Sequence, residues 1–390
     1  MPDILQEPDW YLARQKSFES PQTLESIKLP LNQCLNKTLA RKLISLHPLP
    51  PFDTSMMDGW AVSGSGPWKE IGKILAGGKD IAINQGEAVA IATGAKVPEN
   101  TYAVIRHEHA TFKDGIVKLN PEIELKQNQD IRKTGEEAQT GVEVLNEKTI
   151  INPAVIGLAA SCGHDELEVI RNPVIDVLIL GDELLDQGLP IDGKIRDSLS
   201  MQIPGWILNS DAEVGQIKKV PDDLETTKKA IAESKADIFL TTGGTAKGPV
   251  DHIHPAINEL NGELVIDEVK VRPGHPMLLA KLNKNQFLVG LPGNPLAACV
   301  AFVSLAIPVI RKMQGRNLEK LEQVVINQDV PAPDHEHRLF PVFIENNEAT
   351  PVEHWGSAML RGVAQSNAFV IVPPKGASKG TKLDYLKTPW

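Results

Sequence analysis

The chain has 390 residues, and 42% of them are hydrophobic, which is enough apolar material for more than one core. Its 40 basic and 50 acidic residues give a formal net charge of −10. This acidic balance argues against nucleic-acid binding, whose main attraction is the neutralisation of phosphates, although a local pocket can still bind a small phosphorylated ligand.

The cysteines and the apolar segments restrict the compartment. The three cysteines, Cys34, Cys162 and Cys299, lie far apart and form no CxxC pair, so we expect no disulfide framework and no structural zinc site. The N-terminus lacks the charged-then-apolar pattern of a signal peptide. The longest apolar stretch, residues 296–310, is too short for a membrane span and contains Pro308. We expect a cytoplasmic protein without membrane contacts.

The first 170 residues mix helical and β patterns. After a helical start, leucines recur every fourth residue between 31 and 43, which predicts a packing helix. Prolines and glycines exclude a long helix in residues 47–68. Short β-prone runs over 71–117 predict a small β domain. Helix returns at 151–163, with Pro153 suited to its first turn and Gly163 to its C-terminal cap.

From residue 174 the pattern changes to apolar runs that alternate with helix-like stretches. The runs are VIDVLIL, ADIFLTTGG, LVIDEVKV and QFLVGLPGNP. Apolar strands that alternate with helices predict a parallel α/β sheet covered on both faces. The sequence after residue 315 again contains β-prone runs and predicts a small C-terminal β domain.

Three of these runs end in polar or glycine-rich loops, at residues 181–183, 241–244 and 291–295. In an open parallel sheet, such loops share the edge at the carboxyl ends of the strands, where ligands bind. Glycines let backbone N–H groups approach a ligand, and a following helix N-terminus favours an anion. Each loop alone also fits an ordinary turn, but three on one edge predict a site.

The titratable residues near these loops fit either a structural or a metal-binding role. The carboxylates Asp182, Glu183, Asp197 and Asp251 fit either a solvated surface or a Mg²⁺ site with substrate phosphate. The histidine pairs at 107/109 and 252/254 lack a third ligand at a standard spacing, so we interpret them as structural. The segment TTGGTAKGP lacks the spacing of a P-loop.

An ordered set of motifs carries a family resemblance. The motifs are LPPFDTSMMDGWAV (49–62), IATGAKVP (91–98), IRKTGEEAQTG (131–141), GDEL (181–184), TTGGTAKGPVD (241–251), VRPGHP (271–276), GLPGNP (290–295) and GSAMLRGVAQSNAFVIVP (356–373). Together they resemble the MoeA family of molybdopterin molybdenumtransferases, which includes the gephyrin E-domain. The resemblance spans nearly the whole chain.

The resemblance implies a multidomain α/β plus β fold. Residues 1–48 and 128–170 would form a discontinuous domain I, and 49–127 a β domain II. Residues 171–314 would form the molybdopterin-binding α/β domain III with its parallel sheet, and 315–390 a C-terminal β domain IV. It also implies a homodimer with the active site between protomers.

The implied reaction inserts molybdenum from molybdate into adenylylated molybdopterin, releases AMP and forms molybdenum cofactor, with Mg²⁺ as helper. Other proteins of molybdenum cofactor biosynthesis are implied partners. The alternative is a non-catalytic or divergent paralogue that acts as a molybdopterin-binding or scaffold protein. A pure scaffold need not keep polar site residues, so their presence favours the enzyme.

The family motifs assign roles to individual residues. The implied catalytic residues are Asp58, Thr93, Arg132, Glu183 and Asp251. The implied substrate-binding residues are Asp237, Gly243, Gly244, Lys247, Arg272, Pro273, Gly274, His275, Pro292, Gly293, Asn294 and Ser357. Asp251 and Glu183 are the implied metal ligands. Arg132 suits an oxyanion such as molybdate, and Arg272 and His275 are further anion contacts.

The chain departs from the family pattern at a few positions. Ile179-Leu180 replaces a Ser-Thr pair, Ala246-Lys247 replaces a serine and adds a lysine, and Leu199 replaces an amide. Glu137 stands where the family has Asp. The departures fall on implied pterin and phosphate contacts rather than on Asp58 and Glu183.

Overall fold

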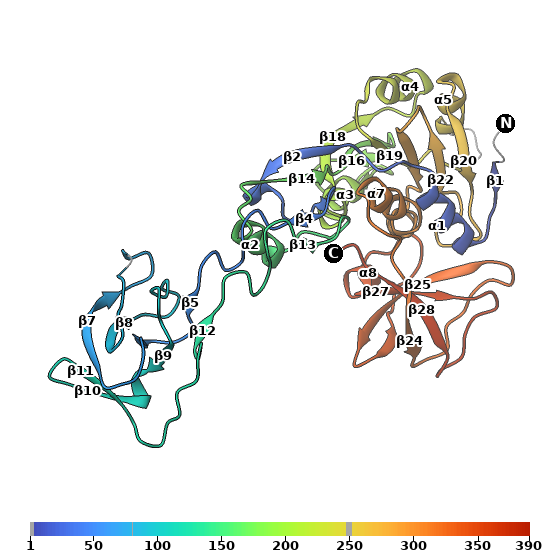
Figure 1. Ribbon diagram of the computed structural model, residues 1–390. Helices are drawn as coiled ribbons and strands as arrows, with labels where there is room; N and C mark the ends of the chain where they lie inside the picture. The colour runs from blue at the N-terminus through green and yellow to red at the C-terminus, as the bar shows by residue number, and fades with distance from the viewer. Residues whose placement is uncertain (1–3, 80, 247–251) are drawn as a thin grey trace. The chain divides into compact units, whose positions relative to one another are not determined.

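The structure, a computed structural model, describes residues 4–79, 81–246 and 252–390 (Figure 1). Contacts divide the chain into two compact units. The larger unit consists of Met1–Ile27 and Ile170–Trp390, and the smaller unit is Lys28–Val169.

Among the described residues, seven strands form the sheet of the larger unit (Figure 1). Their order is β1 (Leu5–Gln6), β20 (Glu263–Asp267), β22 (Leu278–Lys281), β23 (Phe287–Leu291), β19 (Ile238–Thr242), β15 (Val174–Leu180) and β18 (Glu213–Val220). β15, β19 and β23 run parallel, as predicted, and β18, which was not among the predicted strands, runs parallel to β15. β22 runs antiparallel to both of its neighbours, so the sheet is mixed. No described helix intervenes between β20 and β22, and a direct connection of this kind produces antiparallel pairing.

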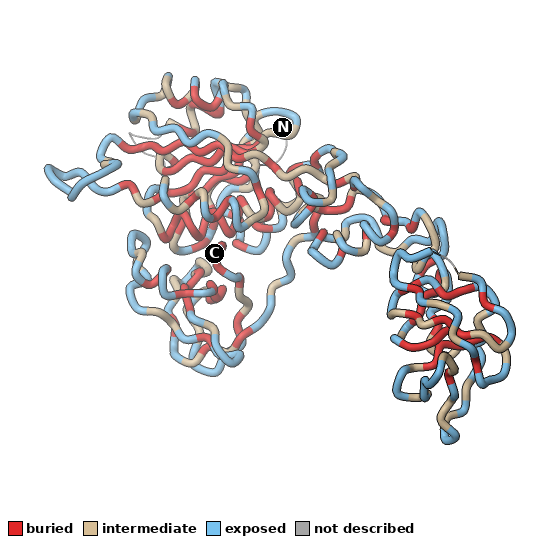
Figure 2. Tube along the Cα trace, turned by 90° about the vertical axis from the view of Figure 1, so that its left-hand side faces the viewer, coloured by how far each residue is buried: buried red, intermediate tan, exposed pale blue. Residues whose placement is uncertain are grey.

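Helices cover both faces of this sheet. One hydrophobic core joins the sheet to α1 (Trp10–Glu19), α3 (Leu199–Asn209) and the helical stretch of α6 (Pro295–Ala301), η3 (Phe302–Ala306) and α7 (Ile307–Met313). The other core joins it to α4 (Leu224–Glu233) and α5 (Ile253–Glu259). Along β15, Val177 and Ile179 enter the first core and Leu178 and Leu180 the second, because successive side chains of a strand point to opposite faces. The central strands β15, β19 and β23 are accordingly buried, apart from the first residue of β15, and buried strands run through the middle of this sheet in Figure 2.

The helix Pro295–Met313 is the one described helix that is long and apolar enough to cross a membrane, but 83% of its apolar window is buried inside the fold. It is therefore a core helix of the larger unit. The backbone N–H of Ile307 donates to the carbonyl of Phe302 in a π-turn just before Pro308, which has no N–H to donate.

The C-terminal part of the larger unit is a small barrel-like β structure, as predicted. β25 (His337–Glu345), β26 (Glu348–Pro351), β24 (Glu322–Ile326), β28 (Lys382–Lys387) and β27 (Ala368–Val372) pair in that order, and β27 pairs back to β25. The short strand β21 (Val271–Arg272) adds to β25 in parallel. The single turn α8 (Arg361–Ala364) precedes β27.

The smaller unit contains the predicted β domain. Its main sheet has the order β10 (Ala110–Lys113), β11 (Ile116–Leu119), β7 (Trp68–Ile74), β8 (Glu87–Ile91), β6 (Gly59–Val62) and β9 (Ala103–Arg106), with η2 (His107–His109) after β9. The predicted helix is α2 (Pro153–Ser161), which Asn152 caps by accepting a hydrogen bond from the N–H of Val155. Gly163 follows its end at φ +93°, as expected of a C-terminal cap.

Short strand pairs complete the fold. β2 (Ser26–Pro30), β14 (Glu166–Ile170) and β3 (Thr38–Leu39) form one sheet, β13 (Glu143–Leu145) pairs with β4 (Leu43–Ile44), and β12 (Ile131–Arg132) pairs with β5 (Thr54–Ser55). In the larger unit, β16 (Leu184–Leu185) pairs with β17 (Ile195–Arg196).

The helix predicted from the leucines at 31–43 is wrong. The segment contains the 3-10 turn η1 (Leu31–Gln33) and the short strands β3 and β4. Leu39 and Leu43 are buried, but Leu35 is 48% exposed, and Asn36 adopts φ +60°. A left-handed residue interrupts an α-helix, so the fourfold spacing places leucines in separate turns and strands.

Candidate functional site

The three loops predicted to share a sheet edge line one cavity of about 560 Å³, which we call the loop cavity. They follow β15, β19 and β23, which are adjacent and parallel, so their carboxyl ends meet. The lining residues from the three loops include Gly181, Glu183, Gly243, Gly244, Gly293 and Asn294. The prediction of a shared edge is confirmed.

Glycines line the cavity where these loops approach each other. Gly243 adopts φ +84°, and its N–H donates to the carbonyl of Leu291 at 2.8 Å, which links the ends of β19 and β23. A Cβ at Gly293 would meet only the Cα of Gly243, at 3.8 Å. The absence of side chains here leaves backbone surface facing the cavity.

The first turn of α3 forms another wall of the loop cavity. Asp197 lines the cavity, and its Oδ1 accepts hydrogen bonds from the N–H groups of Leu199 and Ser200, both at 3.0 Å. Asp197 is 7% exposed, and both of these hydrogen bonds come from the first turn of α3. Asp197 therefore has a structural role in shaping the wall.

Carboxylates also gather at this end of the sheet. Asp222 lines the loop cavity with Glu183. Burial raises the pKa of Asp222, and the nearby carboxylates of Asp182 and Glu183 raise it further, although the N–H of Asp182 opposes this effect. The sequence does not single out Asp222, which lies in none of the recognised motifs. The adjacent Asp223 is the N-cap of α4 and accepts a hydrogen bond from the N–H of Thr226 at 2.8 Å.

A second cavity, of about 560 Å³, is lined by two arginines, and we call it the arginine cavity. It shares Asn294 with the loop cavity, and its lining also includes Arg272, Gly274, Arg338, Trp355 and Ser357. The guanidinium of Arg338 stacks on the ring of Trp355 with its carbon 4.6 Å from the ring centroid. Sequence reasoning missed Arg338 and Trp355 because neither lies in a recognised loop motif.

The two arginines differ in their partners. The Nε of Arg272 donates to Glu336 Oε2 at 2.6 Å. The Nε of Arg338 is buried and has no hydrogen-bond partner among the described residues. Burial lowers the pKa of Arg338, and the charge of Arg272 lowers it further. Arg338 thus brings to the cavity a positive charge that an anion would neutralise.

Backbone geometry fixes the position of this cavity. Gly274 adopts φ +105°, and a Cβ there would meet Met277 Cε at 2.9 Å and the carbonyl oxygen of Ala297 at 3.2 Å. The carbonyl of Ser357 accepts from the N–H of Leu296 at 2.9 Å, which ties the C-terminal segment to the start of α6. Arg272, Pro273, Gly274, Pro292 and Ser357 are thereby brought together, as the motifs imply.

Some residues implied by the motifs lie elsewhere. Asp237 precedes β19, at the opposite end of the strand from the loop cavity, and Arg171 binds it through two hydrogen bonds of 2.6 and 2.7 Å. His275 does not line the arginine cavity and instead lies among carboxylates. Lys247 and Asp251 lie outside the described residues.

In the smaller unit, the structure brings Asp58 and Thr93 together. Asp58 Oδ1 accepts from the N–H of Thr93 at 2.7 Å and from its hydroxyl at 3.1 Å. These two bonds, the backbone one first, lower the pKa of Asp58 and keep it ionised. Arg132 is exposed on β12, beside Lys133, which pairs with Asp53 at 2.8 Å.

Two of the departures from the family pattern are buried. Ile179 and Leu180 are 1% and 5% exposed and belong to the sheet cores. Leu199 begins α3 and lines the loop cavity.

Three family profiles match the chain in order. "MoeA N-terminal region (domain I and II)" matches residues 11–163, "Probable molybdopterin binding domain" matches 176–312, and "MoeA C-terminal region (domain IV)" matches 323–388. A relative from Haemophilus influenzae named molybdopterin molybdenumtransferase is 32% identical, over 92% of this chain and 93% of the relative. The chain belongs to the MoeA family.

Other members support this assignment. A molybdopterin molybdenumtransferase from Staphylococcus aureus is 32% identical over 95% of this chain and 92% of its own length. The crystal structure of a molybdopterin biosynthesis MoeA protein from Pyrococcus horikoshii superposes with a TM-score of 0.78 at 23% identity, covering 97% of this chain and 99% of that chain. The multidomain MoeA-like fold predicted from the sequence is confirmed.

Proposed function

We propose that this MoeA-family chain inserts molybdenum from molybdate into adenylylated molybdopterin, releasing AMP and forming molybdenum cofactor. The observation that carries the proposal is the loop cavity, where three glycine-bearing strand ends meet beside carboxylates. Relatives that match more than nine-tenths of the chain and carry the transferase name support it. The scaffold alternative gains no support from any feature of the cavity.

The loop cavity is the proposed binding site of adenylylated molybdopterin. Gly243, Gly244, Gly293 and Asn294 offer backbone and amide groups to the pterin and its phosphates. Thr242 precedes them at the end of β19 and is buried, which holds the first glycine in place. Asp237, at the far end of this strand, is proposed to act only by fixing the strand through Arg171.

The donor set beside the cavity fits Mg²⁺. Asp182, Glu183 and Asp222 supply carboxylate oxygens, which are the ligands that this hard cation prefers. Burial first, and then the charges of Asp182 and Glu183, raise the pKa of Asp222, and a cation would offset those charges. When bound, Mg²⁺ would stabilise charge on the leaving AMP. The role of Asp251 as a further ligand remains a prediction.

The arginine cavity is the proposed molybdate site. Arg338 and Arg272 supply positive charges, and Gly274 lets the backbone of the wall pack closely against Met277 and Ala297. Ser357 lies at the rim, where its hydroxyl is a candidate donor. Because Asn294 lines both cavities, the oxyanion and the pterin would lie side by side, which positions them for reaction.

Asp58, Thr93 and Arg132 are proposed to act in the same reaction from the smaller unit. The two hydrogen bonds from Thr93 hold the Asp58 carboxylate ionised and oriented, so that it can accept a proton or position a donor. Arg132 offers a further cation to an oxyanion. We also propose a cytoplasmic homodimer with domains I to IV at 1–48 with 128–170, 49–127, 171–314 and 315–390.

Complementation tests the proposal. The chain, expressed in a bacterial strain that lacks its own molybdenumtransferase, should restore molybdoenzyme activity. Glu183→Gln should fail to do so, whereas Asp186→Asn, which changes an exposed carboxylate of the same loop paired with Lys219, should restore it. A soluble parent chain that restores nothing would contradict the proposal.

A further inference from the structure

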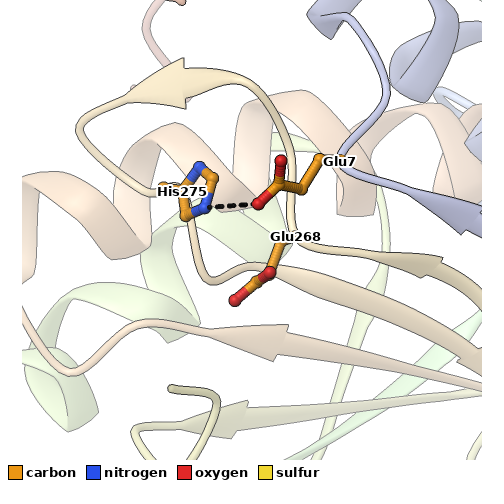
Figure 3. A group of neighbouring side chains, drawn as sticks. All are labelled: Glu7, Glu268 and His275. Carbon is orange, nitrogen blue, oxygen red and sulfur yellow. Dashed lines mark ion pairs between the residues drawn. The ribbon is translucent and has the colours of Figure 1, made fainter. Parts of the chain in front are cut away.

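His275 lies among carboxylates although its sequence motif suggested an anion contact. Side-chain ligand atoms of His275, Glu7 and Glu268 all lie within 4.8 Å of one another (Figure 3). An oxygen of a third carboxylate, Glu336 Oε1, lies 3.3 Å from His275 Nδ1. This setting repels anions and attracts a cation.

The imidazole is not satisfied by hydrogen bonds. His275 Nε2 is 3.6 Å from Glu7 Oε1, which is too long for a hydrogen bond. His275 Nδ1 is within ion-pair distance of Glu336, yet it is buried without an aligned hydrogen-bond partner among the described residues. The side chain is 18% exposed but Nδ1 is buried, so bulk water does not remove the cost of leaving Nδ1 unpaired.

The spacing matches that of ligands around a metal ion. Two atoms bound at 2.0–2.1 Å to a tetrahedral Zn²⁺ lie about 3.4 Å apart. The observed separation of 3.6 Å between Nε2 and the Glu7 oxygen is close to this value. One imidazole nitrogen and two carboxylates also form a recurrent kind of ligand set for Zn²⁺ and Mn²⁺, whereas Mg²⁺ prefers oxygen ligands throughout.

We propose that Glu7, Glu268 and His275 bind a divalent transition-metal ion, with Zn²⁺ as the representative metal and water in the fourth position. Glu336 faces the other ring nitrogen, which is the arrangement that orients a metal-binding histidine. Arg272 donates to the other oxygen of Glu336 and so offsets its charge. This metal site is independent of molybdenum transfer.

The ion would fasten the N-terminal strand to the sheet. Glu7 directly follows β1, Glu268 directly follows β20, and His275 lies in the connection from β20 to β22. β1 is a two-residue edge strand that pairs with β20 through Leu5 and Gln6. A metal bound by residues after both strands would restrain this pairing and stabilise the edge.

Calorimetric titration of the chelator-treated whole chain with ZnCl₂ tests the site. We expect one Zn²⁺ per chain, and we expect His275→Gln and Glu7→Gln to lose this binding event. Glu336→Gln should weaken it by about 10–100-fold, as expected for a group that orients a ligand. Excess Mg²⁺ should not displace the bound Zn²⁺.

His337→Gln is the matched control. His337 is similarly buried and its Nδ1 lies 3.1 Å from Asp9, but it has no second carboxylate in a described metal-like cluster. It should keep full Zn²⁺ binding. Melting temperatures measured in chelator should agree among parent and variants, and Glu7, which is 48% exposed, provides a variant that folds.

Three results would overturn the proposal. The first is a parent chain that binds no Zn²⁺. The second is equal binding by parent and His275→Gln, and the third is displacement by Mg²⁺. Because the readout is metal stoichiometry, failure here leaves the proposed transferase function untouched, and failure of that function leaves this site untouched.

Discussion

Asp58 is an exposed carboxylate held by both polar groups of Thr93, so its substitution separates chemistry from folding. Asp58→Ala should lower AMP release by about 10²-fold or more, the range expected for a positioned acid–base group, and leave the melting temperature near that of the parent. Glu99→Ala, which changes an exposed carboxylate of the same unit, is the control. Parent-like turnover by Asp58→Ala would remove this residue from the catalytic set.

Two adjacent aspartates should show opposite pH effects on stability. Burial raises the pKa of Asp222, so its ionisation weakens folding progressively as pH rises from the unfolded-state pKa through the folded-state pKa. Asp222→Asn should therefore be more stable than the parent at neutral pH, and the gain should shrink as the pH falls towards about 4.

Asp223 provides the matched comparison. Hydrogen bonds from the N–H and hydroxyl of Thr226 lower the pKa of Asp223, so its ionised form stabilises the fold and this contribution is lost as the pH falls through its folded-state pKa. Asp223→Asn should be less stable than the parent at neutral pH. Urea unfolding across about pH 4 to 7 measures both effects, and equal pH trends in the two variants would contradict them.

Several site residues were predictable from sequence because a motif coincides with a strand end. Glu183, Gly243 and Asn294 line the loop cavity as expected. Asp237 and His275 belong to motifs too, but which end of a strand a residue occupies, and which way a turn directs an imidazole, depend on tertiary packing. Arg338 carries no local pattern, because its role arises from stacking on Trp355 and proximity to Arg272.

At the scale of elements, two glycines in the site loops should respond differently to alanine. Gly274→Ala should lower the free energy of unfolding by about 1 kcal/mol or more, because φ is +105° and the new Cβ would meet Met277 and Ala297. Gly293→Ala should fold as the parent does, since its Cβ meets only Gly243 at 3.8 Å, but should bind adenylylated molybdopterin more weakly.

Denaturant unfolding and ligand titration of both variants measure these effects. Equal stability of the two variants would contradict the strained geometry at Gly274. Unchanged ligand affinity of Gly293→Ala would contradict the placement of the ligand against the loop backbone.

Secondary structure was predictable where one periodicity dominates. The runs of β15, β19 and β23 are apolar because both faces of each strand are buried, and this pattern has no helical alternative of matching length. The helix predicted from the leucines at 31–43 is wrong because their spacing does not reveal that a residue between them, Asn36, adopts a left-handed conformation. The reversed direction of β22 was not predictable from its composition, because it is set by the connection to β20.

At the scale of the whole molecule, the proposal includes a homodimer. Size-exclusion chromatography with light scattering at micromolar concentration should give twice the chain mass of 42.5 kDa. A symmetric pair would hold two equal sites, so each dimer should bind two equivalents of adenylylated molybdopterin. A stable monomer with full activity would contradict this part of the proposal.

We propose that the loop cavity and the arginine cavity together perform molybdenum insertion. The most direct measurement is AMP release by the purified chain from adenylylated molybdopterin with Mg²⁺, with and without molybdate. We predict molybdate-dependent release that Arg338→Ala reduces by raising the molybdate concentration required, with binding of adenylylated molybdopterin unchanged. Tight binding of adenylylated molybdopterin without any molybdate-dependent release of AMP would contradict the claim and identify a binding protein instead.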